Sequence, residues 1–230
     1  MAFDGTTNTI VNPNGNNFTI LNGIQKGNNL FHSFSNFSVP TGGSATFDLT
    51  NTPNITTIFS RVTGGNVSNI DGLICKVNSS NPVSLFLMNS VGIVFGANAR
   101  LNIGGSFVGT TANSIKFADG VEFSAVNSTT PPLLTMSVPI GLQLGSSASP
   151  IQVQGKGNDG IVPTSNFGIV SSPGKTIALV GGDITFTGGV ITAPVGRIEV
   201  GAVGSGTVNL TPTPAGWQLG YAQVEDFRDH

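Results

Sequence analysis

Residues 177–200 read IALVGGDITFTGGVITAPVGRIEV, and this stretch decides the fold. Short apolar or β-branched runs at Ile177-Ala-Leu179, Ile184-Thr-Phe186, Val190-Ile191 and Ile198-Glu-Val200 alternate with glycine-rich corners. The interval from Ile177 to Ile198 is twenty-one residues and holds three strands with three turns. This spacing is typical of one coil of a parallel β-helix, in which short strands stack on those of the next coil.

The same rhythm occurs earlier in the chain, with apolar clusters at Leu85-Phe-Leu87, Ile93-Val-Phe95, Leu101-Asn-Ile103, Ile115-Lys-Phe117 and Val121-Glu-Phe123. We therefore predict an all-β, right-handed parallel β-helix of roughly eight to ten coils, stacked about 4.8 Å apart. Ile198 is expected in a buried apolar column. Residues 125–150 depart from the rhythm and predict a projecting antiparallel hairpin. A β-sandwich stays open as an alternative, because Asp71-Gly72 and Asp119-Gly120 are typical of hairpin turns.

The composition predicts one domain, residues 1–230, with a sizeable hydrophobic core. Apolar residues make up 38% of the chain and include fifteen Phe, whereas charged residues make up 9%. Nine Lys and Arg against eleven Asp and Glu give a net charge of −2, which offers no basic surface for nucleic acid. No run approaches the roughly twenty apolar residues of a membrane-spanning helix, so we expect no stable membrane insertion.

Two features bear on export and on redox chemistry. The segment Met1-Ala-Phe-Asp-Gly5 lacks the basic and apolar regions of a secretory signal peptide, so we expect that any such peptide has been removed. Cys75 is the only cysteine of the chain. It therefore supports neither a disulfide framework nor a cysteine-based zinc site, and a small buried residue is the simpler interpretation.

Two glycine motifs resemble phosphate-binding loops but lack the required context. Residues 155–160 match G-x-G-x-x-G, yet Ile161-Val-Pro163 cannot begin the helix that would hold a pyrophosphate. Pro173-Gly-Lys-Thr176 resembles the end of a P-loop, but the earlier glycine is out of step by one residue and a strand follows. We expect turns at both places, a type I or II turn after Pro173, and no cofactor or metal.

Catalytic arrangements are scarce in the sequence. The histidines that a Ser/His/Asp hydrolase would need are His32, in a strand-like run and expected to be half-buried, and His230, the last residue. Asp159 and Asp183 could stack on adjacent coils, and Asp119 lies close to Glu122. Paired carboxylates would suit a polysaccharide-active β-helix enzyme. We expect solvated turn carboxylates and no enzyme, and keep the polysaccharide-active enzyme as the alternative.

Three stretches together resemble the amino-terminal secretion (TPS) domain of filamentous-haemagglutinin-like exoproteins, the cargo of two-partner secretion. They are Asn29-Leu-Phe-His-Ser-Phe-Ser-Asn-Phe-Ser-Val39, Ser60-Arg-Val-Thr-Gly-Gly-Asn-Val-Ser-Asn-Ile-Asp-Gly72 and residues 85–108, LFLMNSVGIVFGANARLNIGGSFV. Their order and spacing also match, and they are closer to cyanobacterial members than to pathogen adhesins. The resemblance implies a parallel β-helix with a cap at about residues 1–30 and extra-helical antiparallel strands.

Two short motifs are tied to secretion in that family, of the forms N-P-N-L and N-P-N-G-I. The first aligns with Thr52-Pro53-Asn54-Ile55. The second aligns with Asn89-Ser90-Val91-Gly92-Ile93, which lacks the proline and the middle asparagine, so that its turn must be held by its surroundings or be weaker. Asn12-Pro13-Asn14-Gly15 matches literally but lies too early, and we interpret it as a terminal turn.

The resemblance implies a non-catalytic secretion domain that is recognised in the periplasm by the POTRA domains of an outer-membrane transporter barrel and that seeds β-helical folding. It also implies a long carboxy-terminal passenger, such as an adhesin, exported to the cell surface or the medium. Pro53, Asn54, Ile55, Asn89, Gly92 and Ile93 are the implied partner-binding residues. A purely structural role for the motif asparagines and glycines, as stacked ladders and corners, is equally open.

Overall fold

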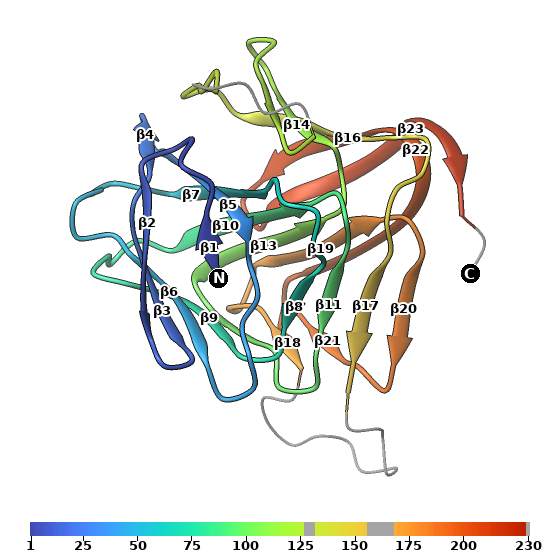
Figure 1. Ribbon diagram of the computed structural model, residues 1–230. Coiled ribbons are helices and arrows are strands. Elements are labelled where there is room, and N and C mark those ends of the chain that lie inside the picture. The colour runs from blue at the N-terminus through green and yellow to red at the C-terminus, as the bar shows by residue number, and fades with distance from the viewer. Residues whose placement is uncertain (127–131, 156–167, 229–230) are drawn as a thin grey trace.

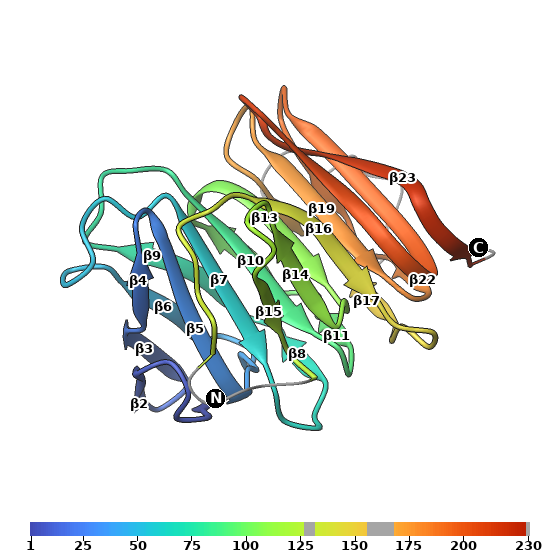
Figure 2. The ribbon, with the colours of Figure 1, turned by 90° about the horizontal axis from the view of Figure 1, so that it is seen from above.

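The computed structural model describes residues 1–126, 132–155 and 168–228, and all regular elements in these ranges are β-strands. The main face of the molecule is a run of parallel strands, which lie side by side in Figure 2. Along the sheet these strands are β5 (Asn29–Asn36), β7 (Thr57–Val62), β10 (Val83–Asn89), β13 (Gly104–Thr110), β19 (Thr176–Gly181) and β22 (Arg197–Thr213).

Two further faces complete each coil, so the fold is the predicted parallel β-helix (Figure 1). The second face contains β8 (Ser68–Ile70), β11 (Ile93–Phe95), β17 (Ile151–Gln154) and β20 (Ile184–Thr187), all parallel. The third face contains β3 (Asn17–Asn22), β6 (Ser44–Asp48), β9 (Leu73–Val77) and β12 (Arg100–Asn102), followed by the separate pair β18 (Ile169–Val170) and β21 (Ile191–Thr192).

The amino-terminal strands pair antiparallel with the first coil. These strands are β1 (Ala2–Phe3), β2 (Thr9–Asn14) and β4 (Ile24–Lys26), of which β1 and β4 pair with β5 and β2 pairs with β3. Asn14 lies opposite Asn17 in the β2–β3 pair, and Gly15 has a φ of 57° between them. The motif Asn12-Pro13-Asn14-Gly15 is therefore a terminal turn, as predicted.

A second, antiparallel layer covers the outer surface of the main face. It is built from β14 (Ser114–Phe117), β15 (Glu122–Ser124), β16 (Pro139–Leu144), the second half of β22 and β23 (Gly216–Phe227). The projecting antiparallel hairpin predicted for residues 125–150 needs correction, because its strand β16 is part of this layer. β16 pairs with β14 on one side and with β22 on the other, because apolar side chains of these strands pack onto the main face.

Both surfaces of the main face are covered, so that β7, β10, β13 and β19 are buried at nearly every position. One column of stacked side chains points into the helix and contains Leu30, Ile58, Leu85, Phe107, Ile177 and Ile198. The alternate positions point outward and begin with Phe31, Phe59 and Phe86, whose rings stack with centroids 5.2 and 4.9 Å apart. The molecule therefore has an interior core and an outer core.

Two quantitative expectations need correction. Ile198 belongs to the interior column, but among the described residues it is the final member, and it is 46% exposed because no described coil packs on it. The main face has six parallel strands among the described residues, fewer than the predicted eight to ten coils. The reason is that residues 111–126 and 132–150 and the β22–β23 hairpin leave the helix to build the outer layer.

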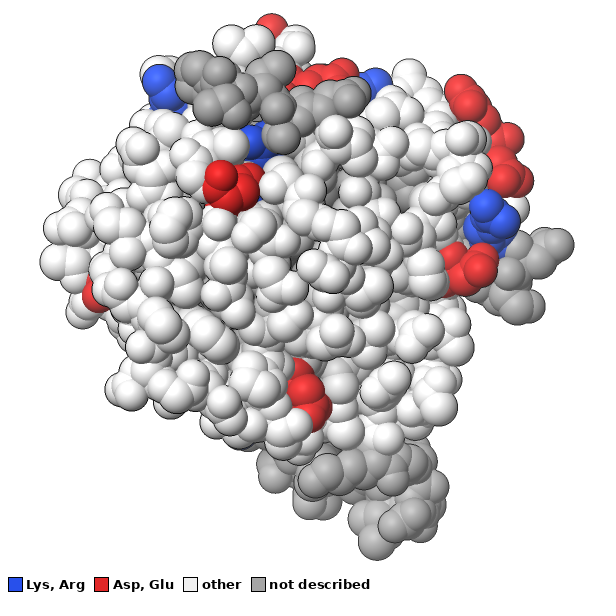
Figure 3. All heavy atoms as spheres, viewed as in Figure 1, with Lys and Arg blue, Asp and Glu red and all other residues white. Residues whose placement is uncertain are grey.

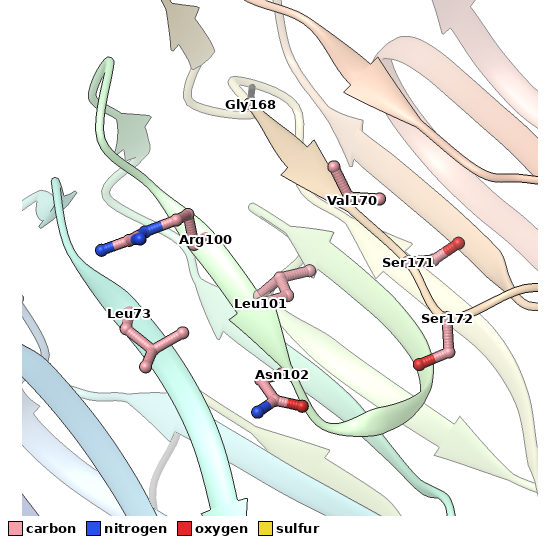
Figure 4. A pocket seen from close by; sticks show the side chains of 8 residues that line it. All are labelled: Leu73, Arg100, Leu101, Asn102, Gly168, Val170, Ser171 and Ser172. Carbon is pink, nitrogen blue, oxygen red and sulfur yellow. The ribbon is translucent and has the colours of Figure 1, made fainter. Parts of the chain in front are cut away.

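Charged residues are few and scattered on the face shown in Figure 3, in keeping with the net charge of −2. No helix in the described ranges is long and apolar enough to cross a membrane. The third face is interrupted between β12 and β18, which do not pair. A cavity of about 310 Å³ lies at this break (Figure 4). It is lined by Leu73, Arg100, Leu101, Asn102, Gly168, Val170, Ser171 and Ser172.

Candidate recognition motifs

The first motif, Thr52-Pro53-Asn54-Ile55, forms the corner that leads into β7. Pro53 and Asn54 are exposed, whereas Ile55 is fully buried in the interior core. Asn54 has a φ of 67°, a conformation that asparagine adopts more readily than most other residues with a side chain. The corner therefore presents Pro53 and Asn54 outward and is anchored from within by Ile55.

The second motif, residues 89–93, forms the corner between β10 and β11. Asn89 is fully buried. Its Nδ2 donates hydrogen bonds to Asn66 O at 3.0 Å and to Ser68 Oγ at 2.9 Å, and its Oδ1 accepts one from Val91 N at 3.0 Å. Both ends of the side-chain amide are thus satisfied within the domain, which makes Asn89 a corner-forming residue.

Neighbouring groups hold this second turn although its proline is missing. Gly92 N donates to Asn89 O at 3.1 Å, and Ser149 Oγ donates to Ser90 O at 2.7 Å. Gly92 has a φ of 130°, which requires glycine, and Ile93 is fully buried between β8 and β17. Of the two possibilities raised by the altered motif, support from its surroundings is the one that the geometry bears out.

The two motifs do not form one patch. In the pairing of β7 with β10, Thr57 lies opposite Ser84 and Val62 lies opposite Asn89. The first motif precedes Thr57 and the second begins at Asn89, so they lie at opposite ends of β7. Six residues of β-strand separate them by about 17 Å.

Sequence reasoning missed a buried arginine on β7, the strand that runs between these corners. Arg61 is 1% exposed, and its guanidinium donates to Ser33 Oγ at 2.8 Å, to Ser124 O at 2.6 Å and to Thr6 Oγ1 at 3.1 Å. The guanidinium also lies 4.6 Å from the centre of the Phe123 ring. The sequence offered one signal for this site, the single charged residue of β7. A buried arginine needs several hydrogen-bond partners, so this residue could have indicated a polar cluster in the core.

Asp4 completes this cluster. Its carboxylate accepts hydrogen bonds from Ser33 Oγ at 2.5 Å, Thr63 Oγ1 at 2.8 Å and Thr6 N at 2.9 Å. Burial raises the pKa of Asp4, but the hydrogen bonds from Ser33, Thr6 and Thr63 outweigh it and hold this pKa below its usual value. Burial lowers the pKa of Arg61, an effect that the charge of Asp4 opposes. The cluster ties the amino terminus, the main face and β15 together.

The histidine that a hydrolase would have needed is a core residue. His32 is 1% exposed rather than half-buried, and its ring packs beside Phe34 and Phe47. Its Nδ1 lies 3.1 Å from Thr9 Oγ1, and burial lowers its pKa to about 3. His230 and Asp159 lie outside the described residues, so the Asp159/Asp183 pair is not seen.

The remaining carboxylates and the cysteine have local partners. Asp119 accepts hydrogen bonds from Val121 N at 3.2 Å and from Thr135 Oγ1, Glu122 accepts one from Ser114 Oγ at 2.9 Å, and Asp183 is exposed in a turn. Cys75 is buried, as expected, with its Sγ 3.3 Å from Thr46 Oγ1. Within the described ranges, no three His, Cys, Asp or Glu side chains are grouped so that they could hold a metal ion.

The P-loop-like segment is a turn. Lys175 N donates to Ser172 O at 3.1 Å across Pro173 and Gly174, and Gly174 has a φ of 73°, as in a type II turn. Residues 156–160 of the other glycine motif lie outside the described ranges.

A comparison with known protein families identifies the family of this β-helical domain. The model of the TPS secretion domain matches residues 1–230. The chain belongs to the TPS secretion domain family. The three sequence stretches and the two corner motifs lie within the residues that this match covers.

Solved structures agree on the fold. This TPS domain is similar to the HMW1 secretion domain from Haemophilus influenzae, a β-helix, with 17% sequence identity and a TM-score of 0.63. The match covers 96% of this chain and 48% of that one, so the chain spans about half the length of its structural relative. No curated protein matches the chain.

Proposed function

We propose that this TPS domain is the non-catalytic secretion domain of a larger exported exoprotein and is recognised in the periplasm by the POTRA domains of its outer-membrane transporter. The match of the TPS model over residues 1–230 carries this proposal. The exoprotein would be of the cyanobacterial type and would carry its passenger, such as an adhesin, beyond the secretion domain. It would reach the cell surface or the medium through the transporter, without nucleic acid or stable membrane insertion.

The exposed corner at Pro53 and Asn54 supports direct contact with the transporter. Both side chains face outward in the folded domain, and the positive φ of Asn54 fixes the direction of the corner. A partner can reach them without any rearrangement. We therefore assign the recognition role of the first motif to Pro53 and Asn54, with Ile55 as their internal anchor.

The second motif would contact the transporter differently. Asn89 and Ile93 are fully buried in the folded domain, so a partner could meet them only while the chain is still extended. An extended segment could add to a strand edge of a POTRA domain through its backbone, with Asn89, Gly92 and Ile93 setting the register. Folding would then withdraw this motif from the partner.

The carboxy-terminal end of the helix supports a role in seeding. Interior columns end there in exposed apolar side chains, namely Ile198, Val200 and Phe186. An apolar coil that packed on these exposed side chains would gain roughly 25 cal/mol of stabilising free energy for each Å² of apolar surface buried. We propose that the first coil of the passenger packs on this end.

Binding of the purified domain to the periplasmic part of its cognate transporter tests the proposal. The folded parent should bind, and Asn54→Ala should bind more weakly at a comparable urea midpoint. Ile177→Asp places a charge in the interior core and should keep the domain unfolded in buffer without urea. This unfolded domain should still bind, through the second motif. Failure of both the folded parent and the unfolded variant to bind would refute recognition by the transporter.

A further inference from the structure

Residues 132–140 form a strap that carries a concentration of exposed apolar side chains (Figure 1, beside β4). Leu133, Met136, Val138 and Ile140 are all exposed, Met136 at 74% and Val138 at 51%. Single exposed apolar residues are ordinary on a protein surface, but four within eight positions mark a contact surface. The strap lies in the part of the chain that was predicted as a projecting hairpin.

The outward direction of these side chains is built into the fold. Asn29, 8% exposed, donates two hydrogen bonds from its Nδ2, to Thr135 O at 3.1 Å and to Ser137 O at 2.9 Å. Ala118 N donates to Val138 O at 3.1 Å, and Thr135 and Pro139 are buried. With the backbone and the intervening residues held inward, Met136 and Val138 must face the solvent. Their exposure therefore does not come from a loose loop.

The strap forms one wall of a cleft of about 380 Å³, a volume in the range of ligand-binding pockets. The cleft is also lined by the turn at Gly27, Asn28 and Asn29 and by Thr56 and Thr57 at the start of β7, and the β22–β23 hairpin contributes Pro212 and Trp217. The lining contains no Lys, Arg, Asp or Glu. Burial of a charge here would be costly without a partner, so the occupant must be uncharged and largely apolar.

The cleft is continuous with the exposed corner of the first motif. Thr56 N and Thr57 N donate to Asn28 O at 3.0 and 3.3 Å, and both threonines line the cleft. Gln25 Nε2 bridges Gly27 O at 2.8 Å and Pro53 O at 3.3 Å. A partner in contact with Pro53 and Asn54 therefore reaches the cleft across a single turn.

We propose that the strap and the cleft are the apolar part of the surface on which the transporter docks, and that the occupant is an extended, uncharged segment of its periplasmic domain. Alternate apolar side chains of that segment would pack against Met136 and Val138 and enter the cleft. This inference rests on the proposed function and adds residues that no sequence motif marks. A second copy of the chain is the competing occupant, and it is an outcome of the test.

The test is the double variant Met136→Glu/Val138→Glu, which places two charges on the strap. The control is Ile10→Glu/Val195→Glu, which adds the same two charges at exposed apolar positions elsewhere. All domains are compared for urea midpoint, for sedimentation and for affinity toward the purified, detergent-solubilised transporter. We expect the strap variant to bind at least about tenfold more weakly and the control to bind like the parent. If the charged variant does not fold, Met136→Ser/Val138→Ser replaces it, with an expected loss of about threefold or more.

The outcomes separate this inference from the proposed function. If the strap variant binds like the parent while Asn54→Ala loses affinity, the docking surface is wrong and the function stands. If the parent is a dimer that the strap variant dissociates with no change in transporter affinity, the occupant is a second copy and the inference is overturned. If the parent itself does not bind, both are refuted.

Discussion

At the scale of single residues, burial separates the two asparagines that the family motifs single out. Asn89→Ala leaves Asn66 O, Ser68 Oγ and Val91 N without their partner, which should lower the free energy of unfolding by about 1–3 kcal/mol. Asn54→Gly, at an exposed corner with positive φ, should leave it nearly unchanged. Urea denaturation measures both. Equal losses would contradict the distinction between a structural and an exposed corner.

His32 should make stability depend on pH. Its pKa is lowered by burial to about 3 in the folded domain, whereas an unfolded histidine titrates near 6.5. Between these values the unfolded chain binds a proton that the folded domain does not. Stability is therefore complete above about pH 6.5 and falls as the pH drops toward 3, by up to about 1.4 kcal/mol for each pH unit.

The measurement is the free energy of unfolding at several pH values between 7 and 4. His32→Gln should flatten this dependence, and His230→Gln, at the only other histidine of the chain, should not. The hydrogen-bonded Asp4 acts in a separate window, because its lowered pKa gives stability that is lost only below about pH 4. Parallel profiles for the parent and the His32→Gln variant would show that His32 has the same pKa in the folded domain as in the unfolded chain.

At the scale of the strands, the position of a residue along the interior column of side chains should determine how much unfolding free energy its substitution costs. Ile177 and Ile198 are adjacent in the same interior column, but Ile177 is fully buried and Ile198 is 46% exposed. Ile177→Ala should cost about 2–5 kcal/mol of unfolding free energy in the isolated domain, and Ile198→Ala less than about 1.5 kcal/mol. A similar loss at both positions would mean that the end of the helix is covered.

The strands themselves were predictable from sequence, whereas their outer partners were not. Alternation and glycine corners in residues 177–200 reflect local constraints, so the coil follows from them, as the turn at Pro173 and Gly174 follows from its own residue types. The pairing of β16 with β14 and β22 depends on apolar contacts between residues far apart in sequence. The same holds for the candidate site, since the burial of Asn89 and the guanidinium of Arg61 depends on neighbouring coils.

At the scale of the whole molecule, Arg61 should couple separate elements. Its three hydrogen bonds join β5, β15 and the segment before β2. Arg61→Met removes the guanidinium that donates all three hydrogen bonds and should cost about 3–5 kcal/mol. Hydrogen exchange should then show faster exchange at residues 4–9 and at 122–124 together. Faster exchange in only one of these segments would indicate that the cluster does not join them.

Export itself tests the central claim most directly. The domain, placed behind a signal peptide, is co-expressed with its cognate outer-membrane barrel, and its amounts in the periplasm and in the medium are measured. A known cargo of the same barrel serves as the positive control. We predict that the domain appears in the medium only when the barrel is present, and that Asn54→Ala reduces this amount at unchanged stability. A folded domain that stays in the periplasm while the known cargo is exported would contradict it.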